Sequence, residues 1–275
     1  MKNYRGIIHN HSACSKEGCY PLSVLRQRWA AHLDFAAMTE HAERTSAGDY
    51  ASYLQECEAL SDERFRFIPG LEVATESGDM LLLGCRRFIC TRDPMQVLDE
   101  AADCFILLAH PEEGKVIPQV LEQADGLEGW NGGHMGGYMP PVDWLSSWRK
   151  RLPSGKFLTG GNDIHKVDPK RKILTLVRVD QHPGIPTGEK AILEAMRHGH
   201  FLTTNGIFSV SADGHVFCRT MKVSDRFLFK ACACCYRLGW QAVNACLQLG
   251  GSMLEAFGID KHRRTWLNRL IRQHL

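Results

Sequence analysis

Short apolar runs alternate with helix-spaced apolar residues from the start of the chain to about residue 210. Runs of about four to eight apolar residues between polar ones are typical of buried strands, whereas apolar residues three or four positions apart indicate helices. The pattern predicts strands at 35–38, 65–68, 81–83, 105–109, 127–130 and 157–158, after a first strand near the N-terminus. It predicts helices at 21–33, 49–60, 94–102, 116–123, 141–150 and 188–198.

This alternation predicts an α/β fold with a parallel sheet and crossover helices. Two more strand-and-turn segments follow at 201–206 and 209–214. From residue 221 the character of the chain changes, and residues 227–249 are apolar, cysteine-rich and helical in pattern. We therefore expect one barrel-sized domain over residues 1–215, followed by a helical, basic C-terminal extension over residues 216–275. In β/α barrels the active site lies at the carboxyl ends of the strands.

Residues that commonly bind metals stand at the ends of five short segments, most of which follow apolar runs. Thirteen histidines scattered by chance would not collect at such positions. Imidazole and carboxylate groups at the tips of neighbouring strands can converge on one metal cluster. The five segments are His9-Asn10-His11, Thr39-Glu40-His41, Gly70-Leu71-Glu72, Ala109-His110-Pro111 and Asn162-Asp163-Ile164-His165.

Each segment also has a simpler interpretation when it is taken alone. His9 and His11 would face the same side of an extended strand, because side chains alternate with a period of two. Glu72 follows a glycine and could bridge two cations or be an ordinary turn acid. His110 could equally be a core histidine. The combination of all five segments at matching positions favours a metallohydrolase.

The order and spacing of these segments resemble the PHP (polymerase and histidinol phosphatase) superfamily of metal-dependent phosphoesterases. That family has an opening His-x-His-Ser-x-x-Ser-Asp-Gly, then Thr-Asp-His, Gly-x-Glu, Ala-His-Pro and Ser-Asp-x-His. The first of these motifs corresponds here to the run from His9 to Gly18. The run from Glu194 to Gly206 also resembles a late segment of stand-alone PHP proteins, so the resemblance covers roughly residues 5–215.

The resemblance implies a distorted, seven-stranded, TIM-like β/α barrel with two to three divalent metal ions (Mn, Zn or Fe). It implies one metal held by His9, His11, Glu72 and Asp163, and a second that shares Glu72 and adds His110. A third would be held by His41 and His165 with either Glu17 or Glu40. The expected reaction is attack of metal-activated water on a phosphate ester, in which His41, His165 and Glu72 would be catalytic.

Four basic residues near these motifs could bind the phosphate of a small phosphorylated substrate, or could be solvated surface charges. They are Arg44, Lys166, Lys170 and Arg171. A nucleotide or short oligonucleotide is also compatible, since Trp130, Tyr138, Trp144 and Trp148 surround a glycine-rich loop and could stack on bases. The same aromatic residues could instead belong to the core.

The chain departs from the family pattern in several places. Ile7 stands where an aspartate usually precedes the first histidine, and Ser15-Lys16-Glu17-Gly18 is one residue longer than Ser-Asp-Gly. Glu40 replaces an aspartate. A later family histidine is missing near Asp79-Met80, and where many members use a histidine near Asn131, this chain offers Asn131 or His134. Two alternatives therefore stand beside the phosphoesterase: a degenerate PHP module with a binding or regulatory role, and a metal-dependent hydrolase of a non-phosphate bond.

Composition adds little to this interpretation and excludes some classes. The formal net charge of +2 gives no reason to expect a nucleic-acid or membrane surface, and no stretch approaches the roughly 18 apolar residues of a membrane span. Eleven cysteines without paired zinc-knuckle spacing are typical of reduced thiols. Since no signal peptide is evident, we expect a cytoplasmic protein.

Overall fold

The computed structural model describes residues 1–112, 114–134, 139–165, 172–180 and 188–218. The chain divides into two compact units, one of residues 1–140 and 144–217 and the other of residues 141–143 and 218–275. The first unit is described below. Most of the predicted C-terminal extension lies outside the described residues, so its helical character stays a prediction.

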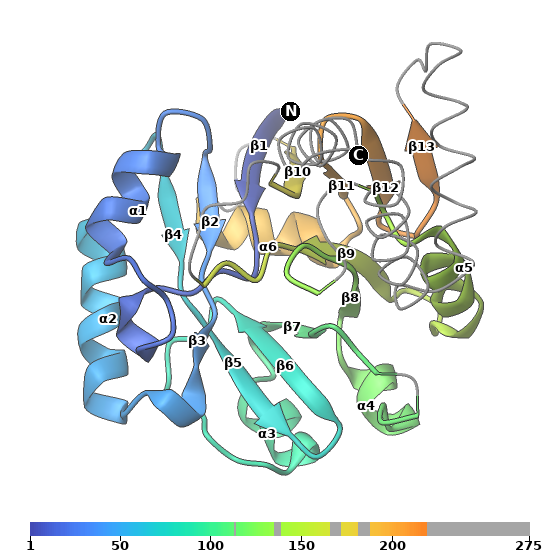
Figure 1. Ribbon diagram of the computed structural model, residues 1–275, viewed down its shortest axis with the longest axis horizontal. Coiled ribbons are helices and arrows are strands. Elements are labelled where there is room, and N and C mark those ends of the chain that lie inside the picture. Colours follow the sequence, from blue (N-terminus) through green and yellow to red (C-terminus); the bar gives the residue numbers. More distant parts are fainter. Residues whose placement is uncertain (113, 135–138, 166–171, 181–187, 219–275) are drawn as a thin grey trace, which may run out of the picture. The chain divides into compact units, whose positions relative to one another are not determined.

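One sheet of the first unit combines parallel and antiparallel strands (Figure 1). In the middle, β1 pairs in parallel with β2, and β2 pairs in parallel with β4. On its other side β1 pairs antiparallel with β10, and the antiparallel pairing continues through β11 to β12. In sheet order the strands are β13 (Val216–Cys218), β12 (Phe208–Ser211), β11 (Phe201–Thr204), β10 (Leu174–Val179), β1 (Lys2–Ile7), β2 (Phe35–Ala37) and β4 (Arg66–Ile68).

The second sheet carries most of the metal-type segments. Its pairings β3–β5, β7–β8 and β8–β9 are parallel, whereas β6 is antiparallel to both of its neighbours. In sheet order the strands are β3 (Glu40–His41), β5 (Gly70–Thr75), β6 (Gly78–Leu83), β7 (Phe105–Leu108), β8 (Gly126–Asn131) and β9 (Phe157–Gly161).

The expected α/β fold is confirmed. The strand pairings, however, do not form the expected parallel, closed TIM-like barrel. The sheets are not closed. A tight turn with Gly78 at φ 99° sends β6 back beside β5, and such hairpins make antiparallel pairs. Pro69, which lacks a backbone N–H, separates β4 from β5. The sheets do meet where the backbone N–H groups of Asn162 and Asp163 donate to the carbonyls of Ile8 and His9.

The described residues contain six α-helices, which lie in the connections close to the predicted positions. Local caps explain two of their starts: the Ser46 hydroxyl accepts from the backbone N–H of Asp49, and the Asp93 carboxylate accepts from that of Met95 behind Pro94. Helix α2 packs beside β4, and α6 packs beside β10 (Figure 1). The helices are α1 (Leu22–Trp29), α2 (Ala47–Ala59), α3 (Pro94–Glu100), α4 (Pro118–Gln123), α5 (Val142–Arg151) and α6 (Glu189–Arg197).

The apolar core lies between α6 and the inner faces of the strands. Phe35, Leu83, Phe105, Ile192 and Met196 are almost completely buried in it. Among the described residues, no helix is both long and apolar enough to cross a membrane. The cytoplasmic location stays a prediction.

Candidate metal centre

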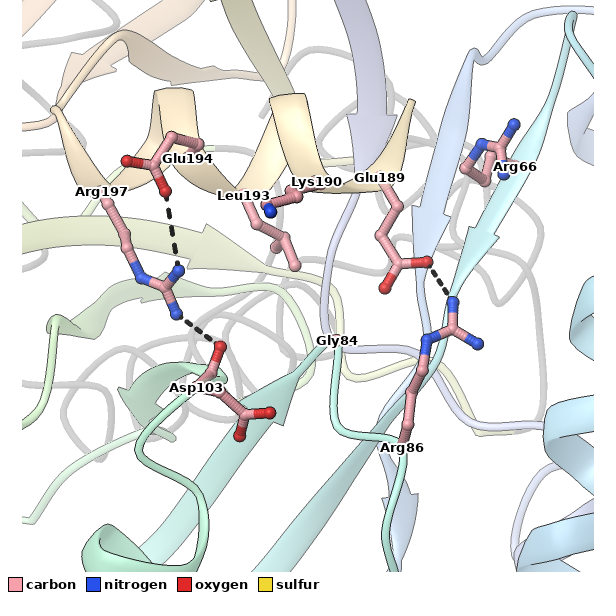
Figure 2. A pocket seen from close by; sticks show the side chains of 9 residues that line it. All are labelled: Arg66, Gly84, Arg86, Asp103, Glu189, Lys190, Leu193, Glu194 and Arg197. Atoms are coloured by element: carbon pink, nitrogen blue, oxygen red, sulfur yellow. Dashed lines mark hydrogen bonds and ion pairs between the residues drawn. The ribbon is translucent and has the colours of Figure 1, made fainter. Parts of the chain in front are cut away.

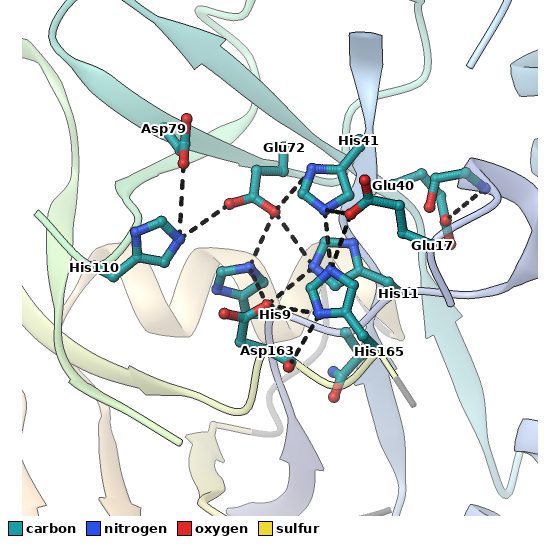
Figure 3. A network of polar contacts seen from close by, with 12 residues as sticks. His9, His11, Glu17, Glu40, His41, Glu72, Asp79, His110, Asp163 and His165 are labelled. Carbon is teal, nitrogen blue, oxygen red and sulfur yellow. Dashed lines mark hydrogen bonds and ion pairs between the residues drawn. The ribbon is translucent and has the colours of Figure 1, made fainter. Parts of the chain in front are cut away.

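The five metal-type segments come together at one place in the fold (Figure 3). His9 and His11 follow β1, and Asp163 and His165 follow β9. His41 ends β3, Glu72 lies within β5, and His110 follows β7. Because neighbouring parallel strands end at the same edge of a sheet, residues far apart in sequence meet there.

Two imidazoles and two carboxylates form the buried floor of this cluster. His9 Nε2 lies 3.2 Å from Glu72 Oε2 and 3.5 Å from Asp163 Oδ1. His11 Nε2 lies 3.3 Å and 3.4 Å from the same two oxygens. The four groups therefore surround one point, and each histidine nitrogen faces both carboxylates.

Two further groups of side chains extend the floor toward solvent on either side. On one side, His41 Nε2 lies 3.1 Å from His165 Nε2 and 3.2 Å from Glu17 Oε2. His11 stacks on both rings, with ring centroids 4.4 Å from His41 and 4.2 Å from His165. This group joins the floor through His11, so the cluster is continuous.

On the other side, the second oxygens of the floor carboxylates are used. Glu72 Oε1 lies 3.3 Å from His110 Nε2, and Asp163 Oδ2 lies 3.2 Å from His134 Nε2. Asp79 Oδ2 approaches His110 Nε2 to 3.8 Å. Glu72 and Asp163 therefore face two directions each, which is the arrangement a bridging carboxylate requires.

The spacing of these groups fits divalent cations. With metal–ligand bonds of about 2.1 Å and tetrahedral or octahedral angles, two ligand atoms on one ion lie roughly 3.0 to 3.4 Å apart. The distances on the floor are of that size. Four overlapping triplets have ligand atoms within 4.8 Å of one another. They are His9–His11–Asp163, His9–Glu72–His110, His11–His41–His165 and His110–His134–Asp163.

His11 provides a second indication that the donor set fits a metal. Both of its ring nitrogens are buried, and neither makes a hydrogen bond with any of the described residues. Burial lowers the pKa of His11 to about 4, against the opposing influence of the nearby Asp163 carboxylate. A neutral, buried imidazole without a hydrogen-bond partner is a ready metal ligand.

Mutual electrostatics keep the floor carboxylates ionised. Burial acts to raise the pKa of Glu72, but the charge of His9 and the hydrogen bonds from His110 and His9 outweigh it and hold that pKa well below the usual value. The same balance lowers the pKa of Asp163, where the neighbouring imidazoles of His11, His134 and His165 oppose burial. Both groups are therefore anionic ligands at neutral pH.

Three residues of the cluster have left-handed backbone, which non-glycine residues rarely adopt. The φ angles are 58° at His9, 26° at His110 and 52° at Asp163. The backbone N–H of Asp163 donates to the carbonyl of His9 at 2.7 Å, so two of these unusual conformations support each other. Such strain is concentrated at functional sites because the surrounding fold must enforce it.

Other predicted site residues lie differently. Glu40 is fully buried, but its carboxylate accepts hydrogen bonds from the backbone N–H groups of Ser12 and Ser15, away from the histidines (Figure 3). Neither Glu40 nor Glu17 belongs to the four triplets, but Glu17 faces His41 and His165. Arg44 is largely exposed at the mouth and contacts Glu17 at 3.1 Å. Lys166, Lys170 and Arg171 lie outside the described residues.

Glu128 in β8 is the residue that sequence reasoning missed. It is completely buried, and its Oε1 lies 2.8 Å from His9 Nδ1. The sequence did contain a signal, since a glutamate inside the apolar run 127–130 must find partners if that strand is buried. His134, which the sequence offered only as an alternative to Asn131, also lies at the cluster, and so does Asp79, which the sequence analysis did not propose as a ligand.

A separate surface hollow of the described chain is lined by paired charges (Figure 2). In this hollow Arg86 pairs with Glu189 at 2.7 Å, and Arg197 pairs with Glu194 at 3.8 Å. It shares no residue with the histidine cluster. Asp103 lies beside it at the amino end of β7, whereas His110 follows the carboxyl end of the same strand.

Comparisons with known proteins agree with this geometry at the level of fold. No protein-family model matches the chain. No curated protein matches it in sequence. Among solved structures, it is similar to a two-domain protein from Bacteroides vulgatus that contains a predicted PHP-like metal-dependent phosphoesterase, with a TM-score of 0.57, 18% identity and 74% of this chain covered.

The match spans only 65% of that Bacteroides protein. A second similar structure is PsfC from Pseudomonas syringae, with a TM-score of 0.51, 14% identity and coverage of 80% of this chain and 93% of that one. At identities this low, the structural similarity is evidence for a shared fold alone. The chain thus shares its fold with the Bacteroides structure, which contains a predicted PHP-like metal-dependent phosphoesterase, and this agrees with the resemblance of its motifs.

Proposed function

We propose that this protein is a metal-dependent phosphoesterase that hydrolyses a phosphate ester of a small metabolite, nucleotide or short oligonucleotide. The observation that carries the proposal is the buried floor, where Glu72 Oε2 and Asp163 Oδ1 both face His9 and His11 at 3.2 to 3.5 Å. No apolar or purely structural role explains two ionised carboxylates and two imidazoles around one buried point.

Two to three divalent ions would be held by these groups. His9, His11, Glu72 and Asp163 would hold one, and Glu72 with His110 would hold a second. His41 and His165, with Glu17 rather than Glu40, would hold a third. Mn, Zn or Fe suits a mixed imidazole and carboxylate donor set. When bound, such ions lower the pKa of water and offset charge on a phosphoryl group.

The graded exposure of the cluster supports access of a substrate from one side. The side chains of His9 and His11 are fully buried, that of His165 is 28% exposed and that of Arg44 is 59% exposed. Glu17 contacts Arg44 through Nε, so the two terminal nitrogens of the guanidinium are available to a phosphoryl oxygen. Arg44 would thereby orient the substrate over the floor.

The first test is the metal content of gently purified protein, measured by mass spectrometry, followed by turnover of a phosphoester panel with Mn²⁺, Zn²⁺ and Fe²⁺. We expect two or three equivalents of metal, and turnover that is lost in Asp163→Asn. Glu122→Gln, an exposed carboxylate on α4, is the matched control and should behave like the unaltered protein.

Two outcomes would contradict the proposal. Stable binding of metal with turnover only of amides or carboxylic esters would indicate a hydrolase of non-phosphate bonds. Absence of metal after reconstitution, with no turnover of any substrate, would favour a degenerate module with a binding role. A preference for oligonucleotides over monoester substrates would identify the class of phosphate ester.

A further inference from the structure

Glu128 is the only described residue whose buried carboxylate touches two of the proposed ligand residues without joining any of the ligand triplets. Its Oε1 lies 2.8 Å from His9 Nδ1. Its Oε2 accepts the backbone N–H of His110 at 3.1 Å and the side-chain amide N–H of Asn131 at 2.9 Å. The carboxylate therefore connects the segment after β1 with the segment after β7.

The partners of Glu128 distinguish a carboxylate from an amide. The backbone of His110 and the amide nitrogen of Asn131 can only donate hydrogen bonds, and a carboxylate can only accept them. A glutamine here would place its NH₂ group against these donors or against His9 Nδ1. In the second case His9 would have to accept at Nδ1 and carry its proton on Nε2, the atom that faces Glu72 and Asp163.

The fold makes room for this carboxylate at Gly161. A Cβ atom at Gly161 would lie 1.7 Å from Glu128 Oε1 and 2.8 Å from His9 Cβ. The glycine thus allows a charged side chain to reach the back of His9. The other fully buried carboxylate near the centre, Glu40, contacts the backbone of Ser12 and Ser15 and no histidine.

We propose that Glu128 is a positioning residue for the metal centre: it keeps the His9 proton on Nδ1, so that Nε2 is free to bind a cation, and it fixes the backbone of His110. A carboxylate behind a ligand histidine commonly orients the ring and strengthens its donor nitrogen. Three of the four triplets contain His9 or His110, whereas His11–His41–His165 contains neither. Glu128 therefore supports one part of the cluster selectively.

This inference rests on metal binding by the cluster but not on the chemistry of the substrate. Affinity for Zn²⁺ and Mn²⁺ is measured by competition with a chromophoric chelator, for the unaltered protein, Glu128→Gln and the exposed control Glu122→Gln. We expect about 10- to 100-fold weaker binding at part of the sites in Glu128→Gln, with the remaining site and the control unchanged. Glu128→Asp, which keeps the charge, should recover part of the loss.

A second measurement uses the unaltered protein and does not depend on the variant's folding. Nitrogen-15 spectra of the histidine rings in Zn²⁺-loaded protein should show the His9 proton on Nδ1, hydrogen-bonded to a carboxylate, and none on Nε2. A proton on Nε2, or equal metal affinity in a folded Glu128→Gln, would overturn the proposal. Lack of metal binding by the unaltered protein would instead contradict the proposed function.

Discussion

Replacing Gly161 by alanine is expected to destabilise the protein and weaken metal binding together. The added Cβ would lie 1.7 Å from Glu128 Oε1, although real Cβ atoms keep at least 3.0 Å from such a neighbour. The carboxylate must therefore move by at least about 1.3 Å. It has little freedom to do so, because His9, His110 and Asn131 all hold it.

The size of the effect follows from these contacts. Loss of one hydrogen bond to a charged group costs about 1.5 to 3 kcal/mol, and overpacking of a buried site costs about 1 to 3 kcal/mol. The contact of the new Cβ with His9 Cβ adds to the second effect. Since the two are relieved by the same movement, we expect a loss of about 2 to 4 kcal/mol in the free energy of unfolding.

The assay is urea unfolding followed by tryptophan fluorescence, with a chelator present so that metal loss does not contribute. Gly48→Ala is the matched control, because Gly48 lies in α2 and its nearest atom to a new Cβ is Ser46 Oγ at 3.9 Å. The control should gain about 0.5 to 1 kcal/mol. If Gly161→Ala changes stability by less than about 0.5 kcal/mol and binds metal normally, the packing argument for Glu128 is wrong.

Three other outcomes are expected. Saturating divalent metal should raise the melting temperature, measured by calorimetry with and without chelator, by about 5 to 10 °C at 100 times the dissociation constant, and an unchanged melting temperature would contradict metal binding to the folded state. Arg44→Ala should raise KM for a phosphoester several-fold while stability changes by less than about 0.5 kcal/mol, and a normal KM would remove Arg44 from the substrate site. Burial raises the pKa of Glu189, against the opposing charges of Arg86 and Arg66, so the folded protein favours the protonated carboxyl. The stability that this preference contributes is present at low pH and is lost as pH rises through the folded-state pKa. Urea unfolding at several pH values should therefore show the unaltered protein losing stability relative to Glu189→Gln as pH rises above about 4.5, and parallel curves would refute this.

The sequence was most informative where metal-type residues stand next to strand-like apolar runs and where apolar residues have regular helical spacing. His9, His41, Glu72, His110 and Asp163 each follow or end a strand-like run, and the structure brings them to one cluster. Helices α1 to α6 lie near their predicted positions because their apolar spacing is regular and the starts of α2 and α3 have clear caps. Both kinds of evidence come from residues close together in sequence, and such local patterns can be interpreted without knowledge of the tertiary structure.

What the sequence missed depends on contacts between distant segments. Strand direction was predicted as parallel throughout, but the Gly78 turn makes β6 antiparallel, and β10 was not predicted at all. Glu40 looked equivalent to Glu17, yet only the folded loop shows that the N–H groups of Ser12 and Ser15 take its carboxylate. Glu128 was hidden because its partners are 119 and 18 residues away in sequence.

Backbone stability and the proposed metal chemistry make opposite demands at His9, His110 and Asp163. Each holds a left-handed backbone, which disfavours any residue but glycine by roughly 1 kcal/mol or more. Random substitutions to glycine there would relieve strain while removing an imidazole or a carboxylate. A lineage released from the need for this chemistry would therefore drift toward glycine at these positions. A chain that keeps all three side chains, as this one does, retains that backbone strain at the residues that would hold the metals.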